Sequence, residues 1–195
     1  MNSLEGVMVV GLTGQTGAGK TTVCKIFSEN GFSIINADHV ARQVMEKGQP
    51  CLKEICEFFG KDILLENGIL DRPKLAGLVF TDKKKLELLN SITYPYITSE
   101  ILKTIRRLSF QGNKLILLDA PTLFESRADD FCELIISVIS RDNLRLERIV
   151  ERDKISRESA QYRMDSQLKE EFFRQNSDFI IKNNSDTVSY THLRA

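Results

Sequence analysis

The sequence predicts an α/β fold in which a parallel sheet is flanked by helices. Three observations lead to this prediction: short β-branched runs alternate with longer amphipathic stretches, each run is apolar, and a glycine-rich loop follows the first run. Short apolar strands of this kind are typical of a sheet that is covered on both faces. The predicted strands are Val7–Leu12, Phe32–Asn36, Lys114–Asp119, Leu134–Ser140 and Asp178–Ile181.

Length and composition favour one compact domain. A chain of 195 residues, 42% hydrophobic and 28% charged, can bury a sizeable core but is short for two independent domains. Lys and Arg together number 27, as do Asp and Glu, so the net charge is zero and neither nucleic acid nor a membrane is expected as a partner. We expect a monomer or a weak homo-oligomer that binds a small molecule.

The cysteines and the N-terminal residues indicate a reducing, cytoplasmic location. The four cysteines are scattered without a C-x-x-C pair, which favours free thiols over a zinc site or disulfides. The apolar run Val7–Leu12 is too short for a signal peptide, and no run reaches the roughly 20 residues that span a bilayer.

Two segments depart from the alternating pattern. Residues 51–111 contain no convincing strand and are predicted to form a helical insert, with helix starts at Asp71 and at Asp82. Residues 141–171 are densely charged and contain six arginines, at positions 141, 145, 148, 152, 157 and 163.

The last residues differ from the rest of the chain. A closing helix is expected after Asp186, but residues 187–195 have no helical apolar period and resemble a translated sequencing adapter. We therefore predict one domain over residues 1–186 and a non-native tail over residues 187–195.

A phosphate-binding loop follows the first predicted strand. Residues 14–21 have the sequence GQTGAGKT, which matches G-x-x-x-x-G-K-[ST] between a strand and a helix. With glycine near 7% of residues, a chance match has a probability on the order of one in a hundred. Glycines let backbone N–H groups approach phosphate oxygens, and the helix N-terminus adds partial positive charge. The alternative is a glycine-rich turn with an exposed lysine.

The motif assigns roles to individual residues. Lys20 is expected to reach the β- and γ-phosphates of ATP, and the Thr21 hydroxyl is expected to coordinate Mg²⁺. Asp119 ends an apolar strand and is predicted to hold the same Mg²⁺ directly or through water. The predicted nucleotide-binding segment consists of Gly14, Gln15, Thr16, Gly17, Ala18, Gly19, Lys20, Thr21 and Thr22.

Other residues favour transfer to an organic acceptor over hydrolysis. Ala120 stands where a water-activating ATPase commonly has a glutamate, and the sequence contains no [NT]-K-x-D motif for guanine. Asp38 follows the second predicted strand at the sheet edge where the phosphate loop lies. It could accept the proton of an attacking hydroxyl, or it could cap a helix that starts near His39. His39 itself is a weaker candidate for the base.

Four arginines are spaced by four, three and four residues, which places them on one face of a helix. Stacked guanidinium groups repel one another unless anions intervene, so phosphate binding is plausible for some of them. Pairing with Glu147, Glu151 and Asp153 is an equally weighted alternative. The four are Arg141, Arg145, Arg148 and Arg152.

Taken together, these residues resemble the dephospho-CoA kinase family from about Met8 to Asn184. The order and spacing of several short motifs carry the resemblance. They are VGLTG at 10–14, NADHVAR at 36–42, ITYP at 92–95, PTLFE at 121–125, Arg148 with Arg152-Asp153, Arg163-Met164 with Gln167, and DFIIKN at 178–183.

The resemblance implies phosphorylation of the ribose 3′-hydroxyl of dephospho-CoA by ATP, the last step of coenzyme A synthesis. It implies that Asp38 is the catalytic base, that the helical insert binds the acceptor, and that the arginine-bearing segment is a mobile lid in which Arg148 and Arg152 contact ATP. Two positions depart from the usual family pattern: Asn36 replaces an aspartate and Tyr94 replaces a histidine.

Two alternatives remain open. A shikimate-type kinase also has an acid after its second strand, but that class typically carries a Gly-Gly-Gly motif and this sequence has no Gly-Gly pair. A regulatory module that binds ATP without turnover would share the phosphate loop.

Overall fold

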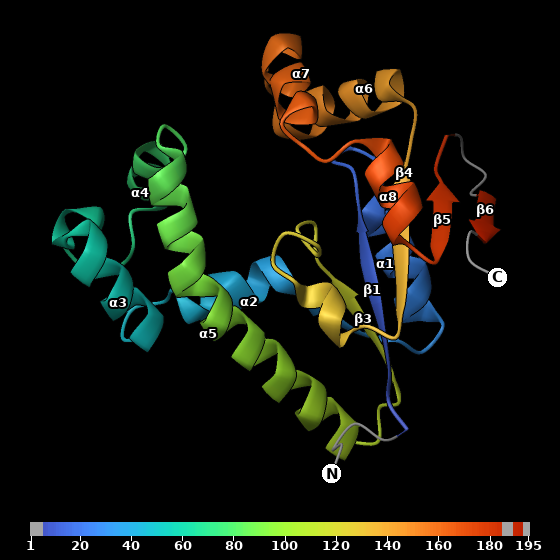
Figure 1. The fold of residues 1–195 in the computed structure, drawn as a ribbon, viewed down its shortest axis with the longest axis horizontal. Helices are drawn as coiled ribbons and strands as arrows, with labels where there is room; N and C mark the ends of the chain where they lie inside the picture. Colours follow the sequence, from blue (N-terminus) through green and yellow to red (C-terminus); the bar gives the residue numbers. More distant parts are fainter. Residues whose placement is uncertain (1–5, 185–188, 193–195) are drawn as a thin grey trace. The chain divides into compact units, whose positions relative to one another are not determined.

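A computed structural model describes residues 6–184 and 189–192, and these residues form the predicted α/β fold (Figure 1). Contacts divide the chain into two compact units. The first consists of residues 1–36 and 108–195, and the second of residues 37–107. The first unit contains a six-stranded sheet with the strand order β2-β3-β1-β4-β5-β6.

Five strands of the sheet are parallel, and all five were predicted to within two residues of their ends. The central strand β1 pairs with β3 on one side and with β4 on the other. Side chains in the middle of β3 are completely buried, which confirms a sheet covered on both faces. The five strands are β1 (Met8–Gly14), β2 (Ser33–Asn36), β3 (Leu115–Asp119), β4 (Leu134–Ile139) and β5 (Phe179–Lys182).

The sixth strand, β6 (Ser189–His192), runs antiparallel to β5 and was not predicted. It lies in the segment predicted to be a non-native tail. Residues 187–188 and 193–195 of that segment lie outside the described residues. Backbone pairing of β6 with β5 does not test whether the segment belongs to the natural protein. The non-native tail therefore stays a prediction.

Helices cover both faces of the sheet. Helix α1 lies against one face and α8 against the other (Figure 1). Alternate residues of β1, among them Val10 and Leu12, pack with Val23 of α1 on one face. On the other face, the hydroxyl of Ser137 in β4 is hydrogen-bonded to that of Ser177, just after α8. The remaining helices of this unit are α6 and α7. Their bounds are α1 (Lys20–Glu29), α6 (Asp142–Asp153), α7 (Arg157–Asp165) and α8 (Glu170–Asn176), with a short 3₁₀ turn at Ala128–Phe131.

The second unit is helical, as predicted for the insert. Its helices are α2 (Ala37–Val44), α3 (Pro50–Phe59), a 3₁₀ turn (Lys61–Ile63), α4 (Arg72–Val79) and α5 (Lys83–Phe110), the last of which continues into the first unit.

The two predicted helix starts in this unit are confirmed. The Asp71 carboxylate accepts the Lys74 N–H at 3.1 Å ahead of α4, and Asp82 accepts the Lys84 N–H at 3.0 Å ahead of α5.

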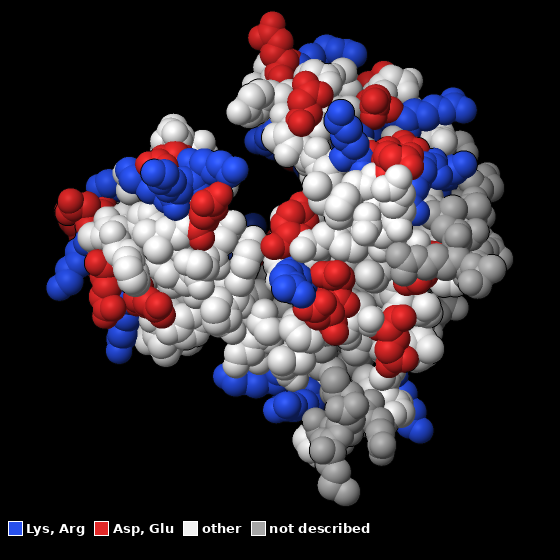
Figure 2. Space-filling model, viewed as in Figure 1, with Lys and Arg blue, Asp and Glu red and all other residues white. Residues whose placement is uncertain are grey.

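No helix among the described residues is long and apolar enough to span a membrane. On the face drawn in Figure 2, acidic and basic side chains are interspersed.

Gly14 ends β1 in a conformation that only glycine fits. Its φ is 129°, and a Cβ atom there would lie 2.1 Å from the Val138 carbonyl oxygen. We predict that Gly14→Ala lowers the free energy of unfolding by at least about 2 kcal/mol more than Gly31→Ala, because Gly31 also has a positive φ but has open space around it. Urea unfolding measures both, and equal effects would contradict the close approach of β1 and β4.

Candidate active site

The phosphate loop has the geometry that its sequence predicts. It connects β1 to α1, and Gly19 occupies the N-cap position of α1. Gly17 has a φ of 74°, and a Cβ atom there would lie 2.7 Å from the Arg145 carbonyl oxygen. The backbone of α6 therefore comes close to the loop, and only a residue without a side chain fits between them.

Donors from the surrounding chain bind the carbonyl oxygens of the loop. The Thr16 oxygen accepts Arg145 Nε at 3.0 Å, the Gly17 oxygen accepts Arg148 Nη1 at 3.4 Å, and the Ala18 oxygen accepts Asn183 Nδ2 at 2.9 Å. The C=O of a trans peptide points away from the N–H of the same peptide. The amides of Gly17 and Gly19 are therefore directed to the side on which a phosphate would bind.

The Lys20 ammonium lies over this loop. It donates to the Gly14 carbonyl at 2.8 Å and to the Gln15 carbonyl at 3.4 Å. A ligand phosphate would offer stronger, charged acceptors to the same ammonium.

Asp119 lies at the end of β3, beside the end of β2. The two strands are in register at Asn36 and Asp119, and Asn36 Nδ2 donates to Asp119 Oδ2 at 3.0 Å. A carboxylate is therefore placed at the carboxyl edge of the sheet, as predicted. The Asn36 amide occupies part of its surroundings.

Cys24 is a neighbour of Asp119 that the sequence analysis missed. Burial, followed by the charge of Asp119 and a hydrogen bond to it, raises the pKa of the Cys24 thiol to about 12, while Lys20 acts in the opposite direction. The thiol is therefore protonated at neutral pH and does not act as a nucleophile. Cys24 lies four residues after Lys20 on a helix, and this spacing could have placed it beside the site. None of the four cysteines forms a disulfide.

The oxygen donors of the loop region suit Mg²⁺. Among the described residues, no group of three or more His, Cys, Asp or Glu side chains could hold a metal ion. The Thr21 hydroxyl and the Asp119 carboxylate are hard donors, and Mg²⁺ commonly takes one or two such ligands and completes its shell with water and phosphate oxygens. The residues present therefore fit an ion that binds together with a nucleotide.

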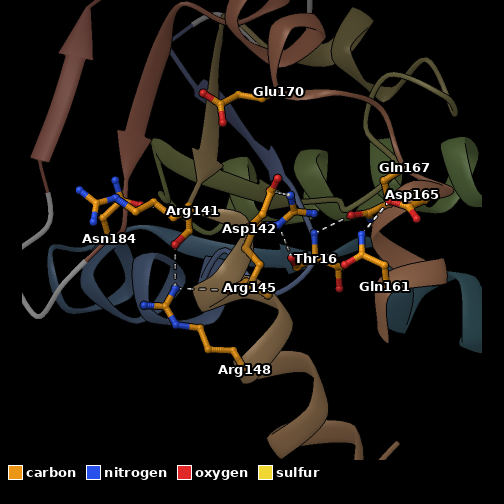
Figure 3. Close-up of polar contacts among 12 residues, drawn as sticks. Thr16, Arg141, Asp142, Arg145, Arg148, Gln161, Asp165, Gln167, Glu170 and Asn184 are labelled. Atoms are coloured by element: carbon orange, nitrogen blue, oxygen red, sulfur yellow. Dashed lines mark hydrogen bonds and ion pairs between the residues drawn. The ribbon is translucent and has the colours of Figure 1, made fainter. Parts of the chain in front are cut away.

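The arginines of residues 141–171 do not form the single cationic face that their spacing predicts. Arg141 precedes α6 as its N-cap residue, and Arg145 is only 3% exposed and pairs with Asp142 at 2.9 Å (Figure 3). Arg148 Nη1 also donates to the Ser140 hydroxyl at 3.3 Å. Spacing alone does not reveal which side of a helix faces the protein, and here Arg145 faces inward.

Arg152 is held by a carboxylate of the same segment. It donates to both oxygens of Asp153, at 2.7 and 3.0 Å, and Arg163 joins the same carboxylate at 2.6 Å. Hydrogen bonds from Arg152, together with the charges of both arginines, hold the pKa of Asp153 below its usual value. Asp142 and Asp153 are thus the acids that pair with these arginines among the described residues.

Asp38 and His39 belong to the second unit and are both exposed. Helix α2 begins at Ala37, so Asp38 lies in the first turn of the helix and not at a cap before it. The expected start near His39 was wrong by two residues. A carboxylate in the first turn still interacts favourably with the helix dipole.

A strand–loop–helix phosphate site with a neighbouring acid defines the class of P-loop nucleotide-binding proteins. The particular family follows from comparison with known proteins. The chain belongs to the dephospho-CoA kinase family, whose sequence model matches residues 8–189.

Individual relatives agree with this assignment. Dephospho-CoA kinases of Fusobacterium nucleatum and Listeria innocua are 42% and 40% identical to the chain; the matches cover 92% and 90% of this chain and 91% and 88% of theirs. The structure of dephospho-CoA kinase from Campylobacter jejuni superposes with a TM-score of 0.67 at 31% identity, covering 91% of this chain and 89% of that one.

Asn36 provides a test of the metal site. Asn36→Asp places a second carboxylate next to Asp119, and like charges at this distance disfavour each other unless a cation intervenes. With ADP bound at pH 7, we predict a Tm several degrees below wild type in EDTA, given about 2–4 °C per kcal/mol for a chain of this size, and substantial recovery with Mg²⁺. Asn36→Ala, which removes the hydrogen bond without adding charge, is the control. The same Mg²⁺ response in both variants would argue against a metal at Asp119.

Proposed function

We propose that this protein transfers the γ-phosphate of ATP to the ribose 3′-hydroxyl of dephospho-CoA, giving ADP and coenzyme A. The observation that carries the proposal is the phosphate loop between β1 and α1, whose carbonyl oxygens are bound from outside and whose amides are directed to the ligand side. Family membership over residues 8–189 supports the choice of acceptor. We also propose a cytoplasmic location, a monomer or weak homo-oligomer, and no nucleic-acid partner.

Each predicted site residue has a role in this proposal. The loop amides and Lys20 bind the phosphates and stabilise the charge that develops on them during transfer. Thr21 and Asp119 would hold Mg²⁺, which when bound neutralises phosphate charge. Asp38 takes the proton of the acceptor hydroxyl, and Arg148 and Arg152 contact ATP.

The two lid arginines differ in what nucleotide binding requires of them. Arg148 is already bonded at the loop, through the Gly17 carbonyl. Arg152 must share or leave the Asp153 carboxylate to reach a phosphate.

The helical unit contains a cavity of its own that supports acceptor binding. The cavity has a volume of about 440 Å³ and lies between α3 and residues 61–68. Leu52, Leu64 and Cys56 contribute apolar wall. Two lysines, Lys53 and Lys61, contribute positive charge against the single carboxylate of Glu57. This combination suits an acceptor that joins an uncharged chain to a diphosphate.

A shikimate-type kinase is the nearest alternative. The structure of a shikimate kinase from Acinetobacter baumannii in complex with shikimate superposes with a TM-score of 0.51 at 17% identity, a likeness that concerns the fold alone. A coupled ADP-release assay with dephospho-CoA, shikimate and nucleosides as acceptors separates the possibilities. We expect turnover with dephospho-CoA; turnover with another acceptor only, or ATP binding without turnover, would overturn the proposal.

Asp38→Asn tests the proposed base. The substitution keeps the volume of the side chain and removes only the interaction of its charge with the dipole of α2, so the free energy of unfolding should change by less than about 1 kcal/mol. It removes the base, and we predict a fall in kcat of about 10² to 10⁴-fold with little change in ATP affinity. His39→Asn is the matched control. Near-normal turnover of Asp38→Asn together with loss of turnover in His39→Asn would move the role of base to His39.

Hydrogen exchange tests where the acceptor binds. We predict that dephospho-CoA slows amide exchange in the helical unit, first in α3 beside its cavity, whereas ATP alone slows exchange in the phosphate loop. Bound ligands suppress local opening, and this makes exchange a measure of where they bind. Protection of the loop by both ligands, with residues 37–107 unchanged, would contradict acceptor binding by the insert.

A further inference from the structure

We propose that Gln167 and Arg145 are positioning residues that fix the backbone of Thr16, and thereby tie the ATP affinity of the phosphate loop to the segment of residues 141–171. The inference rests on the proposed function only in requiring that the loop binds ATP.

Both polar backbone groups of Thr16 are held by side chains from this segment. The Thr16 N–H donates to Gln167 Oε1 at 2.8 Å, and the Thr16 carbonyl accepts Arg145 Nε at 3.0 Å (Figure 3). Arg145 comes from α6 and Gln167 from the connection between α7 and α8. Because one contact holds the peptide before Thr16 and the other holds the peptide after it, together they restrict rotation on both sides of the residue.

Packing restricts the loop at Gly17, where α6 comes close, whereas Thr16 itself is only partly buried. A cavity of about 410 Å³ adjoins the loop and is lined in part by Gln15, Arg145, Gln161, Gln167 and Lys169. On this side the loop borders a cavity, so hydrogen bonds add to the restriction that packing provides at Gly17 and Ala18.

Arg145 is a buried cation whose guanidinium is incompletely hydrogen-bonded. The residue is 3% exposed, and its Nη2 atom has no hydrogen-bond partner among the described residues. Burial lowers the pKa of its guanidinium, and Asp142 acts in the opposite direction. A buried cation with an unsatisfied donor is costly, and an apolar side chain of similar volume is often as stable or more so. What an apolar side chain cannot supply is the hydrogen bond to Thr16.

The two hydrogen bonds predict an effect on nucleotide binding. A loop that is free to rotate at Thr16 must be ordered when ATP binds, and that ordering weakens binding. The net free-energy contribution of a single hydrogen bond corresponds to a change of roughly 2- to 12-fold in affinity. Loss of either contact should therefore weaken ATP binding by about that factor.

Gln167→Ala and its control Gln161→Ala provide the first test. Both glutamines line the cavity, but Gln161 Nε2 donates to Asp165 at 2.9 Å and does not bond the loop. We expect Gln167→Ala to weaken ATP binding, measured by calorimetry without acceptor, by roughly 2- to 12-fold and to speed exchange of the Thr16 amide by a similar factor. Gln161→Ala should change neither. Gln167→Glu retains an oxygen acceptor and should restore the slow exchange of Thr16.

Arg145→Met is the second variant. We expect its ATP affinity to fall by the same factor, because the Thr16 carbonyl loses its donor.

Three results would overturn the proposal. The first is wild-type ATP affinity with unchanged Thr16 exchange in Gln167→Ala. The second is tighter ATP binding by that variant, which would show that Gln167 competes with the nucleotide. The third is wild-type ATP affinity in Arg145→Met. ATP affinity and amide exchange are both measured without the acceptor. Failure of phosphoryl transfer to dephospho-CoA would therefore leave this test intact, and failure of this test would leave the proposed reaction intact.

Discussion

The active site depends on one constraint, which is that the protein binds the carbonyl oxygens of the phosphate loop. The amides opposite the Thr16 and Ala18 carbonyls, those of Gly17 and Gly19, are thereby directed to a ligand. Arg145, Arg148 and Asn183 supply these bonds from α6 and from the end of β5. A loop that had to find this conformation at the moment of binding would lose affinity to ordering. The contacts therefore connect distant parts of the chain to the binding of one triphosphate.

The parallel sheet explains why these groups meet. Strands β1 to β5 present their carboxyl ends at one edge, so the loop after β1, Asp119 at the end of β3 and the segment after β4 converge there. Strand β4 comes so close to Gly14, and helix α6 so close to Gly17, that neither position has room for a side chain. The sheet topology thus brings the phosphate loop, Asp119 and the segment after β4 together, and the glycines make this close approach possible.

The sequence predicts features that are fixed by nearby residues and misses those that depend on distant contacts. The strands, the loop and the helix starts at Asp71 and Asp82 follow from apolar runs, a local motif and local capping. The inward orientation of Arg145 does not, since its partner Thr16 is 129 residues away, and Gln167 is 151 residues from the same residue. The start of α2 was missed by two residues because boundaries depend on context, and no residue pattern predicts the pairing of β6 with β5.

The central claim is that the amides of the phosphate loop bind the phosphates of the nucleotide. The most direct measurement is a titration of ¹⁵N-labelled protein with ADP and Mg²⁺, followed by NMR. The account predicts that the largest downfield shifts occur at the amides of Gly17, Gly19, Lys20 and Thr21, because charged phosphate oxygens replace water as their acceptors. Saturable ADP binding with these four resonances unmoved would contradict it.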